Sequence, residues 1–456
     1  MGSVFDRAFR RLAALTDYET MATVPYHERT YGLRRIDALL RDLGHPCARL
    51  PVFQVVGSKG KGTAAAAAAA ILEEAGVRTG SYFSPHLSHP SERILVGGRP
   101  VPARAFARAV DRVLPLALRL SGDDRPTFFE LMTAAALLLF EEAGCGAAVL
   151  EAGMGGRLDA TTAPRRAAVL LTSVSLDHTA ALGRTTAAIA SEKAAAARRG
   201  VPFFSAVPRR SPAGRATARA CRRAGAPLLL EGREWTVAGA RTALVPGGAA
   251  TRFDLGVRGG PVLRDLAVPL LGVHQARNAG LAAAALLLLA RRGVVPVDGG
   301  AVRRGLAALR LPARLEVLRE RPLVLLDGAH NGASVRAAVR AVRAVAHPRG
   351  RLRVVFAANR DKDLRGMLRA LGRAARLYAT EVPNPRRAAA ADLVRLARAG
   401  GLAASAAGTP RRALASALRA SGPRDAVLVT GSMYLAGAIR PLTSRGGGTR
   451  PRRSGG

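Results

Sequence analysis

The sequence predicts an α/β protein with two domains. The larger N-terminal domain has a mostly parallel sheet with helices on both faces, and the smaller C-terminal domain is also α/β. Short apolar runs alternate with long Ala/Leu/Arg segments of helical character, which is typical of parallel βα units. The 456 residues exceed the roughly 100–200 residues of one domain. With 49% apolar and 22% charged residues, a large core is possible and wholesale disorder is excluded.

Strands and helices alternate through the N-terminal domain. The predicted strands are short apolar runs at Pro51–Val56, Ala147–Glu151, Ala167–Ser173 and Pro202–Ala206. The predicted helices are Lys61–Ala75, Phe128–Ala143, Thr185–Arg198, Asn278–Arg292 and Ala301–Leu309. A helix between successive strands carries the chain back to the same edge, so the strands should run parallel.

Two further regions complete the predicted organisation. Glu231–Pro269 is Gly-rich with short alternating segments, which indicates a small antiparallel insertion. A second βα series then runs through Leu323–Leu326, Ala333–Val345, Arg351–Ala357, Leu364–Leu371 and Ala426–Thr430. We place the boundary near Leu311–Pro312, which gives domains of residues 1–311 and 312–444. Residues 445–456 are rich in Gly, Arg and Pro and are predicted to be a disordered tail.

The charge of this chain is carried almost entirely by arginine. Seventy basic and 32 acidic residues give a net charge of +38, yet only four of the basic residues are lysine and 66 are arginine. Selection for a polyanion partner would not remove lysine, which also binds phosphate. The skew is typical of a GC-rich genome, and we expect no dedicated nucleic-acid partner. The surviving lysines then mark places where a guanidinium is chemically unsuitable.

The number of cysteines and the hydropathy of the chain indicate the cellular compartment in which the protein is expected. Three cysteines without a CxxC pair indicate neither a disulfide framework nor a zinc cluster. The long uncharged apolar stretches fall short of the roughly 20 residues that a membrane span needs. The N-terminus lacks the apolar segment of a signal peptide. We therefore expect a cytoplasmic protein with no membrane partner.

The strongest local motif is GSKGKGT at Gly57–Thr63, between a predicted strand and an alanine-rich helix. Glycines let backbone amides surround phosphate oxygens, the helix N-terminus adds a partial positive charge, and Lys61 adds a full one. The strict GxxxxGK[ST] pattern is not met, because Gly62 separates Lys61 from Thr63. A plain Gly-rich turn is the alternative, and we predict a phosphate-binding loop.

Polar groups follow three other predicted strands. Glu151 ends a buried strand, where an open α/β sheet binds ligands, and could hold Mg²⁺; a strand-ending glutamate before a turn is the alternative. His178 follows the next strand, and Lys193 lies in a helix beyond it. In the C-terminal domain, Asp327 and His330 likewise follow a predicted strand, at its carboxyl end.

Together these segments resemble the folylpolyglutamate synthase/dihydrofolate synthase family, within the Mur-ligase group of ATP-dependent amide-forming enzymes. The resemblance implies a P-loop-type N-terminal domain and a Rossmann-like C-terminal domain. The motifs that carry it are GSKGKGT at 57–63, YFSPHL at 82–87, TFFE at 127–130, EAGMGGRLDAT at 151–161, LDHT at 176–179, SEKA at 191–194, HQARNA at 274–279, ARLE at 313–316, DGAHN at 327–331, RDKD at 360–363 and VTGSMYL at 429–435.

The resemblance also implies a role for each matching residue. ATP would be bound by Gly57, Ser58, Gly60, Lys61, Gly62, Thr63, Asn278, Arg314 and Asp327. Mg²⁺ would be bound by Ser84, Glu151 and His178. The pterin or folate would be lined by Thr127, Phe128, Phe129, Glu130, Arg157, Leu158 and Asp159. Lys61, Lys193, His330 and Asp327 would be catalytic, with Lys193 carbamylated by CO₂ and His330 or Asp327 accepting the proton of the attacking amine.

The implied reaction adds L-glutamate to the carboxylate of a folate or dihydropteroate, using ATP and an acyl phosphate, and the implied enzyme is a monomer acting on small molecules. Two alternatives stay open. A peptidoglycan-type Mur ligase carries a further domain before the phosphate loop, for which Gly57 leaves no room. A basic polyanion-binding protein without catalysis would not need Lys61, Glu151, His178 and Lys193. The sequence departs from the family at Lys59, where asparagine is usual, at Ser58, where threonine is usual, and at Ala195–Ala196, where Gly-Ile is common.

Overall fold

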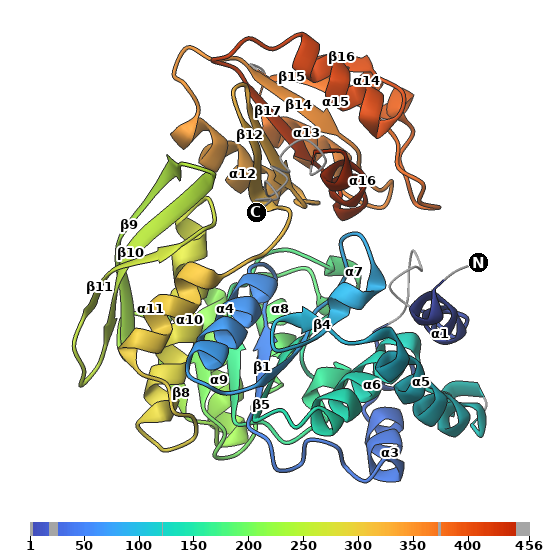
Figure 1. The fold of residues 1–456 in the computed structure, drawn as a ribbon, viewed down its shortest axis with the longest axis vertical. Helices are drawn as coiled ribbons and strands as arrows, with labels where there is room; N and C mark the ends of the chain where they lie inside the picture. Colours follow the sequence, from blue (N-terminus) through green and yellow to red (C-terminus); the bar gives the residue numbers. More distant parts are fainter. Residues whose placement is uncertain (1–2, 18–25, 121, 373–374, 444–456) are drawn as a thin grey trace, which may run out of the picture. The chain divides into compact units, whose positions relative to one another are not determined.

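The computed structural model describes residues 3–17, 26–120, 122–372 and 375–443, in two compact units (Figure 1). Unit 1 consists of Met1–Ala240, Arg252–Pro269 and His274–Arg310, and unit 2 consists of Arg241–Thr251, Leu270–Val273 and Leu311–Gly456. Each unit has its own sheet flanked by helices, so the predicted α/β class is confirmed. The predicted tail at 445–456 lies outside the described residues.

Unit 1 contains an eight-stranded sheet in the order β4-β3-β2-β5-β1-β6-β7-β8. Its strands are β1 (Val52–Val56), β2 (Thr79–Tyr82), β3 (Ile94–Val96), β4 (Arg99–Pro100), β5 (Ala147–Glu151), β6 (Ala168–Leu171), β7 (Phe203–Ser205) and β8 (Leu228–Leu230). The six neighbouring strands β2-β5-β1-β6-β7-β8 pair in parallel, while β3 and β4 add an antiparallel edge. The carboxyl ends of β1, β5 and β6 therefore meet at one edge of the sheet.

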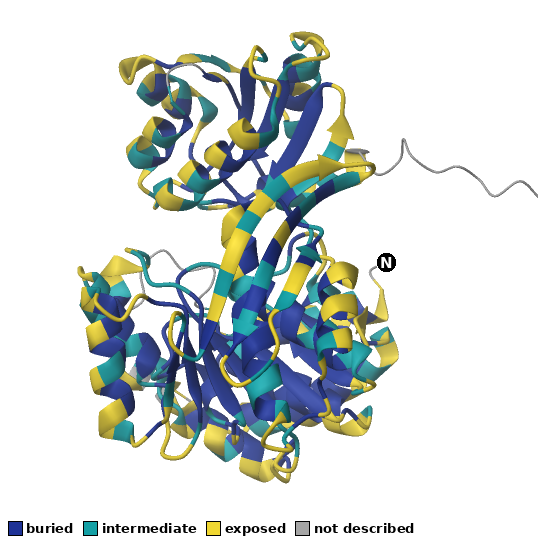
Figure 2. Cartoon of the chain, turned by 90° about the vertical axis from the view of Figure 1, so that its left-hand side faces the viewer, coloured by how far each residue is buried: buried dark blue, intermediate teal, exposed yellow. Residues whose placement is uncertain are grey.

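Helices of unit 1 cover both faces of this sheet, and the strands between them are buried (Figure 2). They are α1 (Val4–Ala13), α2 (Glu28–Tyr31), α3 (Arg34–Asp42), α4 (Lys61–Glu74), α5 (Ala103–Leu118), α6 (Phe128–Glu142), α7 (Thr179–Leu182), α8 (Thr186–Ala194), α9 (Pro212–Ala224), α10 (Val273–Ala290) and α11 (Gly299–Ala308). One apolar core joins α1, α3, α5 and α6 to β1, β2 and β5, and another joins α8 and α9 to β6 and β7.

The predicted insertion is a three-stranded sheet of β9 (Trp235–Val245), β10 (Gly248–Val257) and β11 (Leu263–Val268). These strands are longer than the sequence indicated, because half-buried residues such as Ala250 and Asp254 alternate with buried ones along β10 and weaken a purely apolar signal. Residues 241–251, at the turn between β9 and β10, group with unit 2, whereas the sequence had assigned the whole insertion to the N-terminal domain. Ala249 is buried in the core of unit 2, which is the physical reason.

Unit 2 contains a six-stranded sheet in the order β12-β13-β17-β14-β15-β16, with only β12 antiparallel. Its strands are β12 (Arg314–Glu320), β13 (Leu323–Asp327), β14 (Leu352–Phe356), β15 (Ala375–Ala379), β16 (Ala403–Ala406) and β17 (Ala426–Thr430). Its helices are α12 (Gly332–Val345), α13 (Leu364–Leu371), α14 (Ala390–Ala399), α15 (Pro410–Arg419) and α16 (Met433–Thr443). Its core is formed by β13, β14, β15 and β17 against α12, α13 and α14.

Two predicted helix boundaries were wrong. The helix predicted at Thr185–Arg198 ends at Ala194, because the chain must turn there to enter β7, and this tertiary demand overrides the helix propensity of the following alanines. The helix predicted from Asn278 begins five residues earlier, at Val273. Across the described residues, no helix combines the length and the apolar character that crossing a membrane requires.

Candidate active site

The loop between β1 and α4 requires glycine at two positions. Gly60 precedes α4 with a φ of 86°, a left-handed conformation that side chains disfavour. A Cβ at Gly60 would collide with the Asn278 side chain, and a Cβ at Gly57 would collide with the Thr172 hydroxyl. The loop backbone thus lies close to the Asn278 and Thr172 side chains. The loop ends at the first turn of α4, where the backbone amides have no partner within the helix. This geometry is that of an anion-binding helix N-terminus.

Lys61 is the first residue of α4. Its ammonium donates to the carbonyl of Gly57, with Nζ and O 3.3 Å apart, and so bridges the two ends of the loop. Among the predicted phosphate ligands, Ser58 is buried and Thr63 donates from Oγ1 to Gln275 Oε1 at 2.9 Å. The loop is therefore held in shape by its own side chains.

The segment that follows β6 holds the other side of this loop. The Ser58 amide donates to the Ser173 carbonyl at 2.7 Å, and the Lys59 carbonyl accepts from the hydroxyls of Thr172 and Ser173 at 2.7 and 2.9 Å. The Lys59 ammonium lies 2.9 Å from Asp177 Oδ2, with only 28% and 12% of the two side chains exposed. The unusual lysine of the loop therefore forms an ion pair with the residue before His178.

Glu151 faces the first turn of α4. It ends β5, is 6% exposed, and accepts a hydrogen bond from the Ser84 amide at 3.3 Å. A Cβ placed on Gly62 would lie 3.6 Å from both carboxylate oxygens of Glu151. A hard oxygen donor beside a phosphate loop fits Mg²⁺ well.

His178, the third predicted Mg²⁺ ligand, lies at the start of α7, where it is exposed and has a φ of 49°. Within the described ranges, no group of three or more His, Cys, Asp or Glu side chains forms a metal site. The predicted set contains only two such side chains, Glu151 and His178, so a Mg²⁺ held there would also need hydroxyl, water or phosphate oxygens.

Lys193 is a buried lysine in α8, with 3% of its surface exposed. Burial, reinforced by the positive charge of Lys61, lowers its pKa to about 7, although Asp177 and Asp159 oppose the shift. At neutral pH a large fraction of this amine is uncharged. The Lys193 backbone is packed so closely against Gly156 that a Cβ there would collide with it, which explains one glycine of the GMGG run.

Asp159 is buried beyond that glycine run. Its carboxylate accepts from the amides of Met154 and Thr161, at 2.9 and 3.0 Å, and from the Thr161 hydroxyl. Burial raises its pKa, and these hydrogen bonds and the charge of Lys61 oppose that change. Asp159 therefore shapes the loop and also contributes a carboxyl group to the surroundings of Lys61 and Lys193.

The predicted pterin-side residues divide into structural and accessible ones. Glu130 caps α6 with Thr127 and lies 3.0 Å from Arg35 in a buried ion pair. Phe128 packs edge-on against Phe9, with ring centroids 5.5 Å apart, and belongs to the core.

The other three pterin-side residues lie at the glycine run. Phe129 covers Gly153, where a Cβ would lie 2.9 Å from the ring. Arg157 pairs with Glu192 at 3.1 Å and remains 38% exposed, while Leu158 is buried. Phe129 and Arg157 are thus the members of this set that a substrate could reach.

In unit 2, the predicted residues gather at the end of β13. Asp327 accepts from the amides of Leu315 and Ala329, at 3.0 and 2.9 Å. Burial raises its pKa, and the charge of Arg314 opposes the change. His330 Nδ1 lies 3.1 Å from the Gly328 carbonyl, so Nδ1 carries the proton and Nε2 is the basic nitrogen.

Comparison with known proteins agrees with this arrangement. Residues 313–433 match the family model described as the glutamate ligase domain of Mur ligases. Over 432 residues the chain is 33% identical to the folylpolyglutamate synthase of Lacticaseibacillus casei, an alignment that covers 92% of this chain and 97% of that protein. The chain belongs to the folylpolyglutamate synthase/dihydrofolate synthase family.

Another relative and a solved structure match this chain over different shares of their own length. A probable bifunctional folylpolyglutamate synthase/dihydropteroate synthase of Haloferax volcanii is 36% identical over 418 residues, which is 91% of this chain but 48% of that protein. The chain thus spans about half the length of that relative. The structure of Mycobacterium tuberculosis folylpolyglutamate synthase complexed with ADP matches with a TM-score of 0.85 and 29% identity, covering 98% of this chain and 99% of that one.

Sequence reasoning missed two residues of the candidate site. Gln275 is 3% exposed and accepts from Thr63 and, at 3.4 Å, from Asn278 Nδ2. Its place three residues before Asn278, on the same helix face, was the signal that could have found it. Asp177 was passed over for its neighbour His178, and only the ion pair with Lys59 reveals it.

Proposed function

We propose that this chain is an ATP-dependent ligase that joins the α-amine of L-glutamate to the carboxylate of a dihydropteroate or folate. One observation carries the proposal: a phosphate loop, the Glu151 carboxylate against its helix and the buried Lys193 amine converge in unit 1. Family membership supports the same reaction, and the complex of the mycobacterial relative with ADP supports ATP as the nucleotide.

A carboxylate must be activated before an amine can attack it, because oxide is a poor leaving group. In the proposed first step, a carboxylate oxygen attacks the γ-phosphorus of ATP, ADP leaves and an acyl phosphate forms. Lys61, at the first turn of α4, is suited to stabilise the charge on the transferring phosphoryl group.

In the second step, the glutamate amine attacks the acyl carbon and phosphate leaves with the former C–O bonding pair. His330 or Asp327 accepts the amine's proton. The basic Nε2 of His330 and the raised pKa of Asp327 both support such a role.

We also propose two cofactors. Glu151, Ser84 and His178 would hold Mg²⁺, which when bound neutralises charge on the phosphates; the fit rests on the buried carboxylate facing the phosphate loop. Lys193 would be carbamylated: its neutral amine adds CO₂, a C–N bond forms, and a proton is released. The lowered pKa of Lys193 supports this, since only the neutral amine reacts.

The direct test is turnover with each acceptor. With ATP and glutamate, dihydropteroate or a reduced folate should give ADP, phosphate and an acceptor heavier by one glutamyl residue. Comparing the two acceptors assigns dihydrofolate synthase and folylpolyglutamate synthase activity separately. ATP hydrolysis that does not depend on either acceptor would contradict the proposal.

The ion pair between Lys59 and Asp177 should position the phosphate loop. We expect Lys59→Met to raise the KM for ATP about fivefold with little change in kcat, because a partly buried pair contributes roughly 1 kcal/mol. Asp177→Asn should act similarly, and the double variant should be no worse than either single one.

A surface pair provides the matched control for that prediction. Arg112 and Glu142 lie 2.7 Å apart with 51% and 34% of their side chains exposed. Arg112→Gln removes the same charge and should leave the KM for ATP unchanged. Strictly additive effects of Lys59→Met and Asp177→Asn would show that the pair does not act as a unit.

We expect no functional nucleic-acid site despite the net charge of +38. Aromatic residues make up only 4% of the chain, so stacking platforms for bases are scarce. Binding to DNA or RNA should stay in the nonspecific range of about 10⁻⁴ to 10⁻⁶ M at 0.15 M salt, and should weaken steeply with added salt. A filter-binding titration that gave submicromolar, salt-resistant binding would overturn this.

We further propose that the enzyme works as a cytoplasmic monomer. Cys47, Cys145 and Cys221 are all unpaired and buried, which suits a reducing compartment. Light scattering on the purified chain at assay concentration should give a mass of 47.5 kDa.

A further inference from the structure

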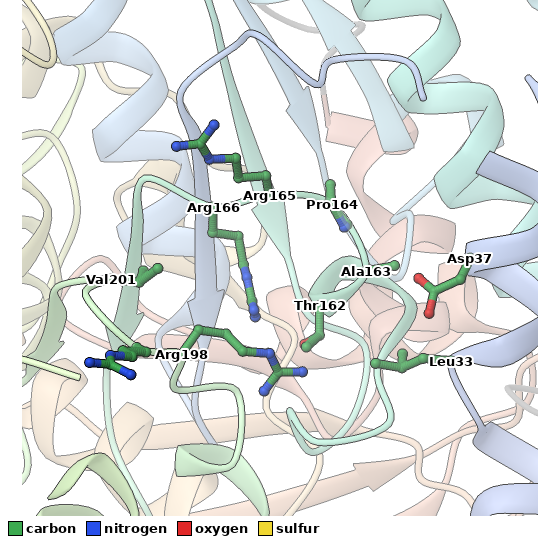
Figure 3. Close-up of a pocket in the computed structure, with 10 residues that line it drawn as sticks. Leu33, Asp37, Thr162, Ala163, Pro164, Arg165, Arg166, Arg198 and Val201 are labelled. Carbon is green, nitrogen blue, oxygen red and sulfur yellow. The ribbon is translucent and has the colours of Figure 1, made fainter. Parts of the chain in front are cut away.

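A second charged site lies within unit 1, at the edge of the sheet where β6 and β7 begin (Figure 3). It is a cavity of about 460 Å³ lined by residues that lead into these strands and by the start of α3. The phosphate loop follows the opposite end of the parallel strand β1. At about 3.3 Å per residue, the five residues of β1 put the two edges roughly 16 Å apart. The cavity is therefore separate from the catalytic phosphate loop.

Arginine dominates the lining of this cavity. Its lining contains Arg165, Arg166, Arg198 and Arg199 but only one carboxylate, that of Asp37. In the described part of the chain, none of these four arginines takes part in an ion pair, whereas Arg157, close by in sequence, pairs with Glu192 at 3.1 Å. The cavity thus concentrates uncompensated positive charge in a concave space.

Arg166 anchors the site from inside the protein. It is only 7% exposed, and its Nη1 donates to Gln54 Oε1 at 2.8 Å. Gln54 is held in turn by donating to the hydroxyls of Thr161 and Thr162, at 2.9 and 2.6 Å. The Nε of Arg166 has no hydrogen-bond partner. A buried guanidinium whose partner is a neutral amide is costly, and an anion in the cavity would offset that cost.

The guanidinium is oriented as well as buried. In Figure 3 the Arg166 side chain extends toward Thr162, while the Arg165 side chain points away from it. Burial and the neighbouring charge of Arg198 lower the pKa of Arg166 to about 10, so it remains protonated at neutral pH. The held guanidinium is therefore preorganised for an anion, and Arg198 and Arg199 supply exposed cations at the mouth.

We propose that this cavity binds a small organic or inorganic anion that carries two or more phosphate or carboxylate charges. Planar guanidinium groups bind both oxyanions through paired hydrogen bonds. Four cations against one carboxylate favour a multiply charged ligand, and the volume exceeds what a single halide would need. The site goes beyond the proposed ligase reaction and does not depend on it.

The test is a calorimetric titration of the Lys61→Ala variant with pyrophosphate and, separately, with citrate in 0.15 M chloride. The Lys61→Ala substitution removes the main cation of the phosphate loop, so anion binding at that loop contributes little to the titration. We expect one site for at least one of the two anions. Arg198→Gln and Arg199→Gln should each weaken it about tenfold, as loss of a charge-assisted hydrogen bond does. Binding of pyrophosphate alone assigns a phosphate ligand, and binding of citrate alone assigns a carboxylate ligand.

Arg108→Gln is the matched control, since Arg108 is an exposed arginine on α5 and its loss changes the net charge equally. It should leave the affinity within twofold. Arg166→Gln should abolish binding; if that variant fails to fold, the two exposed arginines still decide. Failure of both anions to bind at millimolar concentration, or equal weakening by Arg108→Gln and Arg198→Gln, would overturn the proposal.

Discussion

Lys61→Ala should lower kcat/KM for amide formation by about three orders of magnitude while the protein stays folded. The ammonium group lies at the first turn of α4, where the γ-phosphoryl group would sit, and no other lysine occupies that turn. Neutralising charge there matters most in the transition state, so kcat should fall more than the KM for ATP rises. Steady-state assays with saturating acceptor and glutamate would measure both.

The loss of activity in Lys61→Ala should not come from unfolding. In this structure the Lys61 ammonium makes one weak hydrogen bond, to the Gly57 carbonyl at 3.3 Å, so its removal should cost little stability. Circular dichroism and the thermal midpoint of Lys61→Ala should match those of the parent. Substantial turnover by a folded Lys61→Ala protein would remove Lys61 from the reaction.

Lys193→Arg should be nearly inactive even though arginine is also a long basic side chain. Arginine keeps its proton and cannot form a carbamate with CO₂, whereas Lys193 has a pKa lowered to about 7 and is 3% exposed. We expect a loss of at least about 100-fold in kcat, as for removal of a charged group at a reacting centre. Lys193→Ala should recover part of the activity with added acetate, which can replace the missing carboxylate.

The pH dependence separates carbamylation from a purely structural role. The neutral fraction of the Lys193 amine grows as pH rises through about 7, and only the neutral amine adds CO₂. With CO₂ limiting, activity of the parent enzyme should therefore rise from pH 6 to 8 and respond to added bicarbonate. Lys193→Ala rescued by acetate should lose that bicarbonate response. Parent-like activity of Lys193→Arg would eliminate the carbamate.

Much of the backbone plan was readable from local pattern. Apolar runs of strand length followed by alanine-rich helices predicted the two α/β units, and the α/β class is confirmed. Glycines between β1 and α4 indicated the phosphate loop, because they let backbone amides surround phosphate oxygens. The structure places Gly60 at a φ of 86°, which side chains disfavour. The survival of lysine at 61 and 193, among 66 arginines, pointed to chemistry that a guanidinium cannot perform.

The sequence by itself therefore determined the alternation of strands and helices at the centre of each sheet and the residue types at the ends of those strands, since these depend on neighbours a few positions apart. Strands toward the sheet edges, among them β2, β8 and β16, were not predicted. Only the tertiary structure decided which distant groups meet. Lys59 forms an ion pair with Asp177, and Thr63 donates a hydrogen bond to Gln275. Arg166 donates a hydrogen bond to Gln54, which lies 112 positions away in the chain. Burial and electrostatic fields, which lower the pKa of Lys193, are sums over such distant neighbours, and no local pattern contains them.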